Sequence, residues 1–360
     1  MPIKAKERVE QPVRRNLFGE PILYRPRPLF KVDDVADAAF YNLRESGFPY
    51  PKLPLYRCML EINRLSVMGA QELQHTHCAY RVADTYHPHR YEAHGDGLLS
   101  PIKAFNDDRR LRLAILFDLS GKSPDSITPD TFPNDCDFNR SFATINFIRA
   151  TQAAYNFRPG FACYIYRKYC KPGYTVLDTS TGYGGRLVGF MASGIAGQYI
   201  GIDPNTKTHA SNQRMASDLG FTKRVRLFCK PAEEVDARTL PPCDFAFTSP
   251  PYFCKEHYSD EPTQSYIRYK TGDEWRRGFL IPMLRLQFTV LKPGAFSVIN
   301  IADVKIKGQV YPLVQWTVRG ACACGFTAHD STSKFITGQT PGINHKEDIH
   351  EALLVFRKPR

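Results

Sequence analysis

Two acids and a pair of glycines form the first set of residues whose order suggests chemistry. Asp178 ends an apolar run (TVLDTS), Gly182 and Gly184 follow, and Asp203 ends a second run (QYIGIDPN). Glycines let the backbone turn sharply and approach a ligand closely, and a helix that begins after them offers unpaired N–H groups. An acid at 178 would attract an amine, and an acid at 203 typically binds ribose hydroxyls. This order favours a cofactor site over an ordinary strand-turn-helix with capping acids.

The segment Ser249-Pro250-Pro251-Tyr252 follows another apolar run, CDFAF, and begins 71 residues after Asp178. It ends a strand with a hydroxyl, two residues of fixed φ and an aromatic ring. Proline has no N–H and fixes φ, so the pair holds the Pro250 carbonyl in one rigid direction. The alternative is a loop that only terminates the strand. The position of the segment after a fourth predicted strand favours a second part of the same site.

An alternation of strands and helices after residue 173 would bring these residues together. The sequence predicts strands over 175–180, 198–205, 224–232, 243–252, 295–303, 326–334 and 350–358, with helices between most of them. This alternation is typical of an α/β fold. We therefore expect a Rossmann-like, doubly wound, mostly parallel seven-stranded sheet that is closed by an antiparallel pair, with a largely helical extension before it.

A family resemblance rests on these same residues. VLDTSTGYGGRL (176–187) followed by IGIDPN (200–205) resembles the S-adenosylmethionine (SAM) binding motifs of the class I methyltransferases. TSPPY after CDFAF resembles the catalytic motif of the amino-methyltransferases, which methylate exocyclic amines of nucleobases. The resemblance covers about residues 156–357 and implies SAM as the cofactor.

The resemblance implies a role for each cofactor residue. Asp178 and the backbone of Gly182–Gly184 would hold the methionine part of SAM, and Asp203 would bind its ribose hydroxyls. Pro204 would line the adenine, and Glu233, after the third strand, is a candidate for the adenine amine. Further cofactor residues would be Ser180 in the glycine turn and, from the upstream segment NFRPGF, Arg158 and Phe161.

The Ser-Pro-Pro-Tyr segment would hold the target base. An exocyclic amine is a poor nucleophile because its lone pair is conjugated with the ring, and two acceptors aimed at its N–H groups recover that lone pair. Ser249 and the Pro250 carbonyl could supply these acceptors, with Pro251 fixing the turn and Tyr252 stacking on a base that has left the duplex. Asp303, at the end of the fifth strand, is a candidate to take the amine proton, and the alternative is a capping role.

The distribution of charge along the chain suggests the type of binding partner and the domain boundaries. The net charge is +12, of which residues 151–360 carry +10, and residues 1–31 form a basic, proline-rich arm. We expect residues 32–150 to be an accessory region that could recognise the target, and 151–360 to be the methyltransferase domain. Double-stranded DNA is the expected partner and RNA an alternative. Candidate contacts to nucleic acid are Arg14, Arg15, Arg268 and Lys270.

Within the resembling family, Ser-Pro-Pro-Tyr accompanies cytosine N4 methylation more often than adenine N6 methylation, so the expected function is site-specific methylation of DNA at N4 of cytosine. The alternatives are an adenine N6 or RNA amino-methyltransferase, a methyltransferase of a protein amide or small amine, and a nucleic-acid-binding protein that has lost catalysis. A restriction nuclease is a candidate partner, as in restriction-modification systems, and a bacterial or phage origin is expected.

The patterns of cysteine, histidine and hydropathy argue against a disulfide-stabilised, a zinc-binding and a membrane-spanning protein. Ten scattered cysteines without a CxxC pair argue against a disulfide framework or a structural zinc site, and indicate a reducing, cytoplasmic setting. The histidines between 75 and 94 match no standard zinc spacing, so no metal is expected. The N-terminus has no apolar signal core, and the chain has no run long enough for a membrane span.

Overall fold

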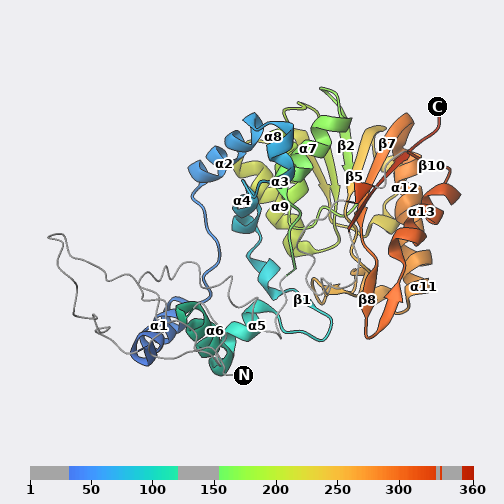
Figure 1. Cartoon of the computed structure of the whole chain (residues 1–360). Helices are drawn as coiled ribbons and strands as arrows, with labels where there is room; N and C mark the ends of the chain where they lie inside the picture. The colour runs from blue at the N-terminus through green and yellow to red at the C-terminus, as the bar shows by residue number, and fades with distance from the viewer. Residues whose placement is uncertain (1–31, 121–153, 330–332, 335–350) are drawn as a thin grey trace, which may run out of the picture.

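The computed structural model describes residues 32–120, 154–329, 333–334 and 351–360 (Figure 1). The predicted arm over 1–31, with Arg14 and Arg15, lies outside these residues. In the part that is described, a central sheet separates two layers of helices.

The central sheet has the strand order β10-β12-β7-β5-β2-β3-β4, and β11 also pairs with β12. Its strands are β2 (Thr175–Asp178), β3 (Gln198–Ile202), β4 (Val225–Phe228), β5 (Cys243–Thr248), β7 (Leu291–Ile301), β10 (Thr327–Ala328), β11 (Ser333–Lys334) and β12 (Ala352–Arg357). The first five are parallel, and β12 runs antiparallel to β7 and β10. The predicted fold class is confirmed, although the strand expected over 326–334 consists of two short strands.

The winding of the sheet reverses at β2, because β3 lies on one side of it and β5 on the other. In open α/β sheets, such a reversal leaves a crevice at the carboxyl ends of the two flanking strands. Asp178 ends β2 and Thr248 ends β5, so the crevice lies where the glycine turn and the Ser-Pro-Pro-Tyr segment begin.

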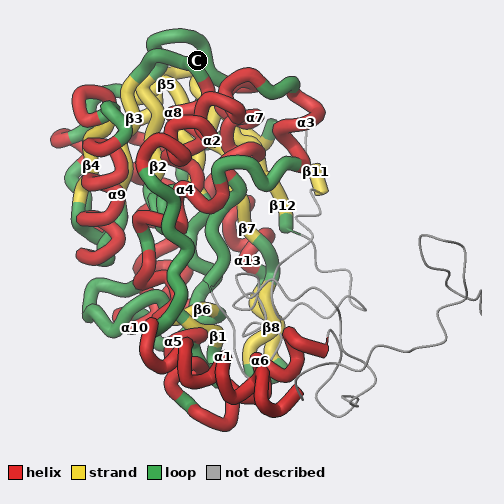
Figure 2. The backbone as a smooth tube through the Cα atoms, turned by 90° about the vertical axis from the view of Figure 1, so that its left-hand side faces the viewer, coloured by secondary structure: helices red, strands yellow, loops and turns green. Residues whose placement is uncertain are grey.

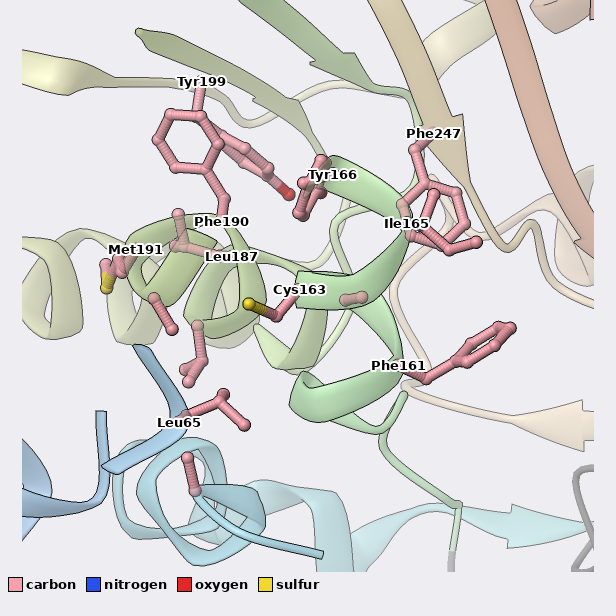
Figure 3. Close-up of a cluster of buried hydrophobic side chains, with 14 of the residues drawn as sticks. Leu65, Phe161, Cys163, Ile165, Tyr166, Leu187, Phe190, Met191, Tyr199 and Phe247 are labelled. Atoms are coloured by element: carbon pink, nitrogen blue, oxygen red, sulfur yellow. The ribbon is translucent and has the colours of Figure 1, made fainter. Parts of the chain in front are cut away.

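Alternating side chains of the strands build a separate core on each face. Phe245 and Phe247 of β5 pack with Phe161 of α7 (Pro159–Tyr169) in one core, and Figure 3 shows this cluster. Ala246 faces the second core, under α12 (Ile281–Val290) and α13 (Leu313–Ala323). A buried side chain contributes about 1.5–3 kcal/mol, so both layers hold the crevice edge rigidly.

Part of the N-terminal region belongs to the sheet domain. Three helices, α2 (Leu55–Val67), α3 (Ala70–His75) and α4 (Tyr80–Tyr86), supply Leu65, Leu73 and Val82 to the core that contains Phe161. A division at residue 150 therefore does not follow the packing, because these helices cover α7 and α8 (Gly185–Ser193).

A second, smaller core lies apart from the sheet. It joins α1 (Val32–Ser46), α5 (Pro101–Asn106) and α6 (Asp108–Ser120) through residues such as Phe40, Phe105 and Leu111. Figure 2 shows these three helices together at one end of the molecule. They form a compact helical unit, and of the region expected to be accessory it is this part that packs independently of the sheet.

The remaining elements of the described residues are one full helix and several short segments. The helix is α9 (Thr206–Asp218), which follows β3. The short helical segments are η1 (Pro88–Glu92), η5 (Thr222–Arg224), η6 (Ala232–Glu234), η7 (Ala237–Thr239), α10 (Ser265–Arg268), α11 (Gly272–Trp275) and a π-helical turn, η8 (Arg276–Leu280). Two small antiparallel pairs join β1 (His94–Gly95) with β6 (Glu256–His257), and β8 (Val304–Ile306) with β9 (Gln309–Tyr311). The β1–β6 pair ties the N-terminal region to the loop that follows Tyr252.

Candidate active site

A cavity of about 560 Å³ opens at the carboxyl edge of the sheet. Its walls come from the segments that follow β2, β3, β4 and β5, and from Asn300 in β7. The structure therefore brings together Ser180, Gly182, Asp203, Pro204, Glu233, Phe161 and the whole Ser-Pro-Pro-Tyr segment. Further lining residues, which sequence analysis did not single out as site residues, include Tyr80, Asn156, Tyr183, Arg186, Gln264 and Glu351.

The glycine turn, residues 179–184, requires glycine at two positions. Gly182 and Gly184 have φ values of 57° and 77°, in the left-handed region that favours glycine. Gly184 also faces the protein interior, since a Cβ there would lie 2.6 Å from Asn212 Oδ1. Gly182 instead lines the cavity, and its N–H donates to Asp203 Oδ2 at 2.8 Å.

Asp203 is held by two backbone donors at the cavity wall. The N–H groups of Gly182 and Asn205 donate to its two carboxylate oxygens. Burial nevertheless raises the pKa of Asp203 from 3.8 to about 6, because desolvation of the charged form outweighs these hydrogen bonds. The carboxylate is well placed to accept from ligand hydroxyls, as its sequence position suggested.

Asp178 has a different role from the expected one. It is fully buried, and its carboxylate accepts from Arg186 Nε at 2.8 Å, Tyr199 Oη at 2.7 Å and Thr248 Oγ1 at 2.9 Å. The expectation that Asp178 holds a ligand amine is therefore not met, because protein donors already occupy its oxygens. Asp178 instead fastens the end of β2 to β5 and to α8, and Arg186 is the member of this group that reaches the cavity.

Glu233 lies at the wall after β4, and one of its oxygens is available to a ligand. Its Oε1 accepts from Arg268 at 3.0 Å and from Tyr269 Oη at 3.3 Å. Its Oε2 is buried and has no hydrogen-bond partner among the described residues. Burial raises the pKa of Glu233. Gln264 Nε2, on the same cavity, is likewise buried without a partner in the described chain.

Two of the residues that were expected to contact nucleic acid lie in the described part of the chain, and their surroundings differ from each other. Arg268 pairs with Glu233 at 3.0 Å and with Glu234 at 2.5 Å, so its guanidinium supports the cavity wall and is not presented to a phosphate. Lys270 stands in the loop after α10, where its backbone N–H donates to Glu274. Its side chain remains a candidate contact.

The Ser-Pro-Pro-Tyr segment is fixed by residues far away in the sequence. Asn300 Nδ2 donates to Tyr252 Oη at 3.0 Å and lies 3.4 Å from Ser249 Oγ. Tyr252 Oη donates to Glu351 Oε1 at 3.1 Å, and burial raises the pKa of Tyr252 well above its usual range. Phe253, the next residue, has a φ of 53°. A left-handed phenylalanine is strained, and here it turns the chain sharply after the segment.

A second carboxylate faces the same end of the cavity. Glu256 lies in β6 and accepts a hydrogen bond from Tyr258 Oη. Burial raises the pKa of Glu256, with a further contribution from the negative charge of Glu351. Tyr183 Oη and Asn300 Oδ1 are buried there without a partner in the part of the chain that is described. These polar groups give this end of the cavity an excess of hydrogen-bond acceptors.

Asp303 does not take part in this group. Its Oδ1 accepts from the backbone N–H of Val314 at 2.9 Å, at the first turn of α13. The expectation that Asp303 accepts the amine proton is not supported, and the capping alternative is observed. The chain leaves β7 at residue 301 and turns Asp303 towards the helix.

Two buried histidines of the 75–94 stretch, His87 and His89, pack against the Tyr183 ring of the glycine turn. His87 Nδ1 lies 2.8 Å from the Ala83 carbonyl, and burial lowers the pKa of His87 to about 3. His89 Nε2 lies 2.9 Å from Thr208 Oγ1 in α9. Among the described residues no group of three His, Cys, Asp or Glu could hold a metal ion. In the same residues no helix is long and apolar enough to cross a membrane.

Comparison with known proteins adds limited information. No protein-family model and no curated protein matches the chain. TrmN from Thermus thermophilus matches with 17% identity over 56% of this chain and 48% of that chain, about half of its length, with a TM-score of 0.38. A putative rRNA-methylase from Clostridium thermocellum matches with 15% identity over 57% of this chain and 99% of that chain, with a TM-score of 0.38.

A methyltransferase from Pyrococcus furiosus matches with 15% identity over 61% of this chain and 94% of that chain, with a TM-score of 0.39. The strand order of the sheet and the crevice at β2 and β5 show the fold, and the side chains of the cavity indicate its chemistry.

Proposed function

We propose that the chain is a SAM-dependent DNA methyltransferase that transfers a methyl group to the exocyclic amine of a flipped base, N4 of cytosine. The observation that carries this proposal is the meeting of two sets of residues in one cavity. The glycine turn, Asp203 and Glu233 line one end of it, and the Ser-Pro-Pro-Tyr segment lines the other.

The polar groups of the first end suit an adenosine. Glu233 Oε2 is a buried acceptor and Gln264 Nε2 a buried donor, and neither has a partner in the described part of the chain. An adenine edge offers the complement, an amine that donates and a ring nitrogen that accepts. Asp203 would accept from ribose hydroxyls, and Pro204 would contact the ring. SAM bound there would supply a methyl group that is already activated.

The second end suits a primary amine on a planar ring. Ser249 and Pro250 line this end of the cavity and carry two acceptors, a hydroxyl and a backbone carbonyl, and the Tyr252 ring is held in place through its hydroxyl. The exocyclic amine would donate to these acceptors, which favours the pyramidal nitrogen that attacks a methyl group. A base inside a duplex cannot reach such a cavity, so the target would be extruded. The net charge of +12 suits a polyanionic partner.

One experiment tests the proposal directly. The purified protein is incubated with SAM that is labelled in the methyl group and with duplex DNA, and the digested nucleosides are separated. Label in N4-methylcytosine supports the proposal, and label in N6-methyladenine would move the target to adenine. Label in RNA or protein but none in DNA would overturn the choice of partner. Tight SAM binding without transfer to any polymer would indicate a binding protein on this scaffold.

A further inference from the structure

A row of hydrogen-bonded groups leads from the Ser-Pro-Pro-Tyr segment into the C-terminal strand. The hydroxyls of Ser249 and Tyr252 share one amide neighbour, and Tyr252 Oη donates to Glu351 Oε1 at 3.1 Å. Asn300 Nδ2 contacts both hydroxyls. Glu351 precedes β12 by one residue and lines the cavity, 99 residues away from Tyr252 along the chain.

Methylation of a primary amine releases a proton that the site must accept. Ser249 is neutral and cannot keep a second proton, and a backbone carbonyl is a still weaker base. Asp303 is occupied at α13 by the N–H of Val314. The acceptor must therefore be a carboxylate that is connected to the Ser-Pro-Pro-Tyr segment, and the hydrogen bond between Tyr252 and Glu351 meets this condition.

We propose that Glu351 is the terminal proton acceptor of the methyl transfer, reached through the hydroxyl of Tyr252; this inference rests on the proposed function. As the nitrogen–methyl bond forms and the carbon–sulfur bond breaks, the nitrogen loses one proton to Tyr252 Oη. Tyr252 passes its own proton to the Glu351 carboxylate. The positive charge of the sulfonium is thus balanced by the loss of one carboxylate charge, and the hydroxyl ends neutral.

Glu256 is the competing carboxylate, and its contacts separate it from this row. Its oxygen is bound by the hydroxyl of Tyr258, two residues further along the same loop, and among the described residues no hydrogen bond connects it to Ser249 or Tyr252. Lys255 and Arg158 also line this end of the cavity, where they can balance the charge of both glutamates. Glu256 is therefore better placed to hold the base than to receive its proton.

The test uses single-turnover transfer from labelled SAM to DNA, because this measures the chemical step without product release. Glu351→Gln and Tyr252→Phe each interrupt the row while they keep the shape of the site. Each is expected to slow transfer about 100-fold, the lower limit for a positioned acid or base. The double variant is expected to be no slower than the slower single variant, because the two groups act in series.

Rescue by a carboxylate from solution distinguishes a proton-accepting role of Glu351 from a purely structural role. Glu351→Ala leaves space at the end of the row, and added formate is expected to restore its transfer rate in proportion to formate concentration. Glu351→Gln fills that space and should not respond. SAM binding, measured by titration calorimetry, should stay within about threefold of wild type in every variant, which shows that the fold and the cofactor end are intact.

Asp303→Asn is the matched control, since it alters an acid near the same strand end that lies off the row, and its transfer rate should match that of wild type. Full activity of Glu351→Gln, additive losses in the double variant, or the absence of formate rescue in a SAM-binding Glu351→Ala would each overturn the relay. If wild type transfers no methyl group to any base, the proposed function fails and the relay fails with it. If only the variants behave differently from expectation, the proposed function stands.

Discussion

The glycine-turn end and the Ser-Pro-Pro-Tyr end of the cavity are both fixed by buried hydrogen bonds, but their partners lie at different distances along the chain. At the first end Asp178 is held by Arg186 and Tyr199, and Gly182 by Asp203, within 21 residues, and Thr248 of β5, 70 residues away, adds a further hydrogen bond to Asp178. At the second end Tyr252 is held by Asn300 and Glu351, which lie 48 and 99 residues away. The short-range contacts of the first end can form when β2 and β3 pair, whereas the second end needs β7 and the C-terminal strand in place.

This difference predicts which property a substitution at each end will change. At the first end the buried Asp178–Arg186 pair is saturated by protein partners, so a substitution in this pair should act mainly on stability, whereas Asp203 and Glu233 line the cavity and should act on SAM binding. At the second end, buried acceptors without partners and a strained Phe253 indicate a site arranged for a ligand, so a substitution there should act mainly on transfer.

The largest expected effect comes from breaking the buried pair at the first end. Asp178→Ala would leave Arg186 charged and buried without its partner, which destabilises a protein by about 3–5 kcal/mol. Urea denaturation followed by circular dichroism measures this loss. Asp236→Ala removes an exposed acid whose partner Arg238 is also exposed; it loses only this pair and a cap on the short turn η7, so it should lower the midpoint far less. Equal stability of both variants would show that Asp178 does not fasten β2.

The next effect tests the second end through activity. Ser249→Ala removes one acceptor for the target amine without leaving a buried charge. Loss of one such preorganised group typically slows a reaction about 100- to 1,000-fold, and we expect that loss in single-turnover transfer with unchanged stability and SAM affinity. Ser46→Ala, at the end of α1, bonds only to its own helix and serves as the control. Full activity of Ser249→Ala would contradict the assignment of the segment.

The sequence was sufficient for the fold and for part of the first end because these depend on short-range patterns. The apolar strand runs, the positive-φ glycines and the acids at strand ends are local signals, and the structure places Gly182 and Asp203 in one wall as expected. The role of the Asp178 carboxylate could not be predicted from such local signals. Whether its carboxylate meets a ligand or Arg186 depends on how α8 packs against β2, although a basic residue eight positions later was visible.

The second end could be predicted only in part. Ser249 and Tyr252 stand out through the paired prolines, whereas Glu351 carries no local signal and reaches the site because β12 pairs with β7. Asp303 shows the converse case, since it is near Asn300 in sequence yet caps α13. Long-range strand pairing decides which acids enter the cavity, and a single sequence contains little information about it.

A smaller effect tests whether the first end binds an adenine. Glu233→Ala removes the buried acceptor Oε2 and should weaken SAM binding about 10- to 100-fold, the range for a hydrogen bond to a charged group. Glu234→Ala is a closely matched control, because Glu234 also pairs with Arg268 but lies outside the cavity lining. Titration calorimetry distinguishes the two. Similar losses in both variants would mean that Arg268, and not the ligand contact, governs the affinity.

The smallest expected effect is the pH dependence of SAM binding through Asp203. Because burial raises the pKa of Asp203 from 3.8 to about 6, the folded protein without ligand keeps its proton until pH 6, and this contribution to stability is lost as the pH rises through that value. Ribose hydroxyls need the ionised carboxylate as an acceptor. SAM affinity should therefore be constant above about pH 7 and fall about tenfold from there to pH 5.

Asp203→Asn cannot titrate and should bind weakly with a flatter profile over the same range. Glu233 and Glu256 also line the cavity and have raised pKa values, so a residual slope in this variant would report on them. If the slope of Asp203→Asn equals that of wild type, the proton is bound elsewhere in the cavity. The SAM affinity of the glycine-turn end would then come from uncharged contacts. In this respect the glycine-turn end would be more similar to the Ser-Pro-Pro-Tyr end.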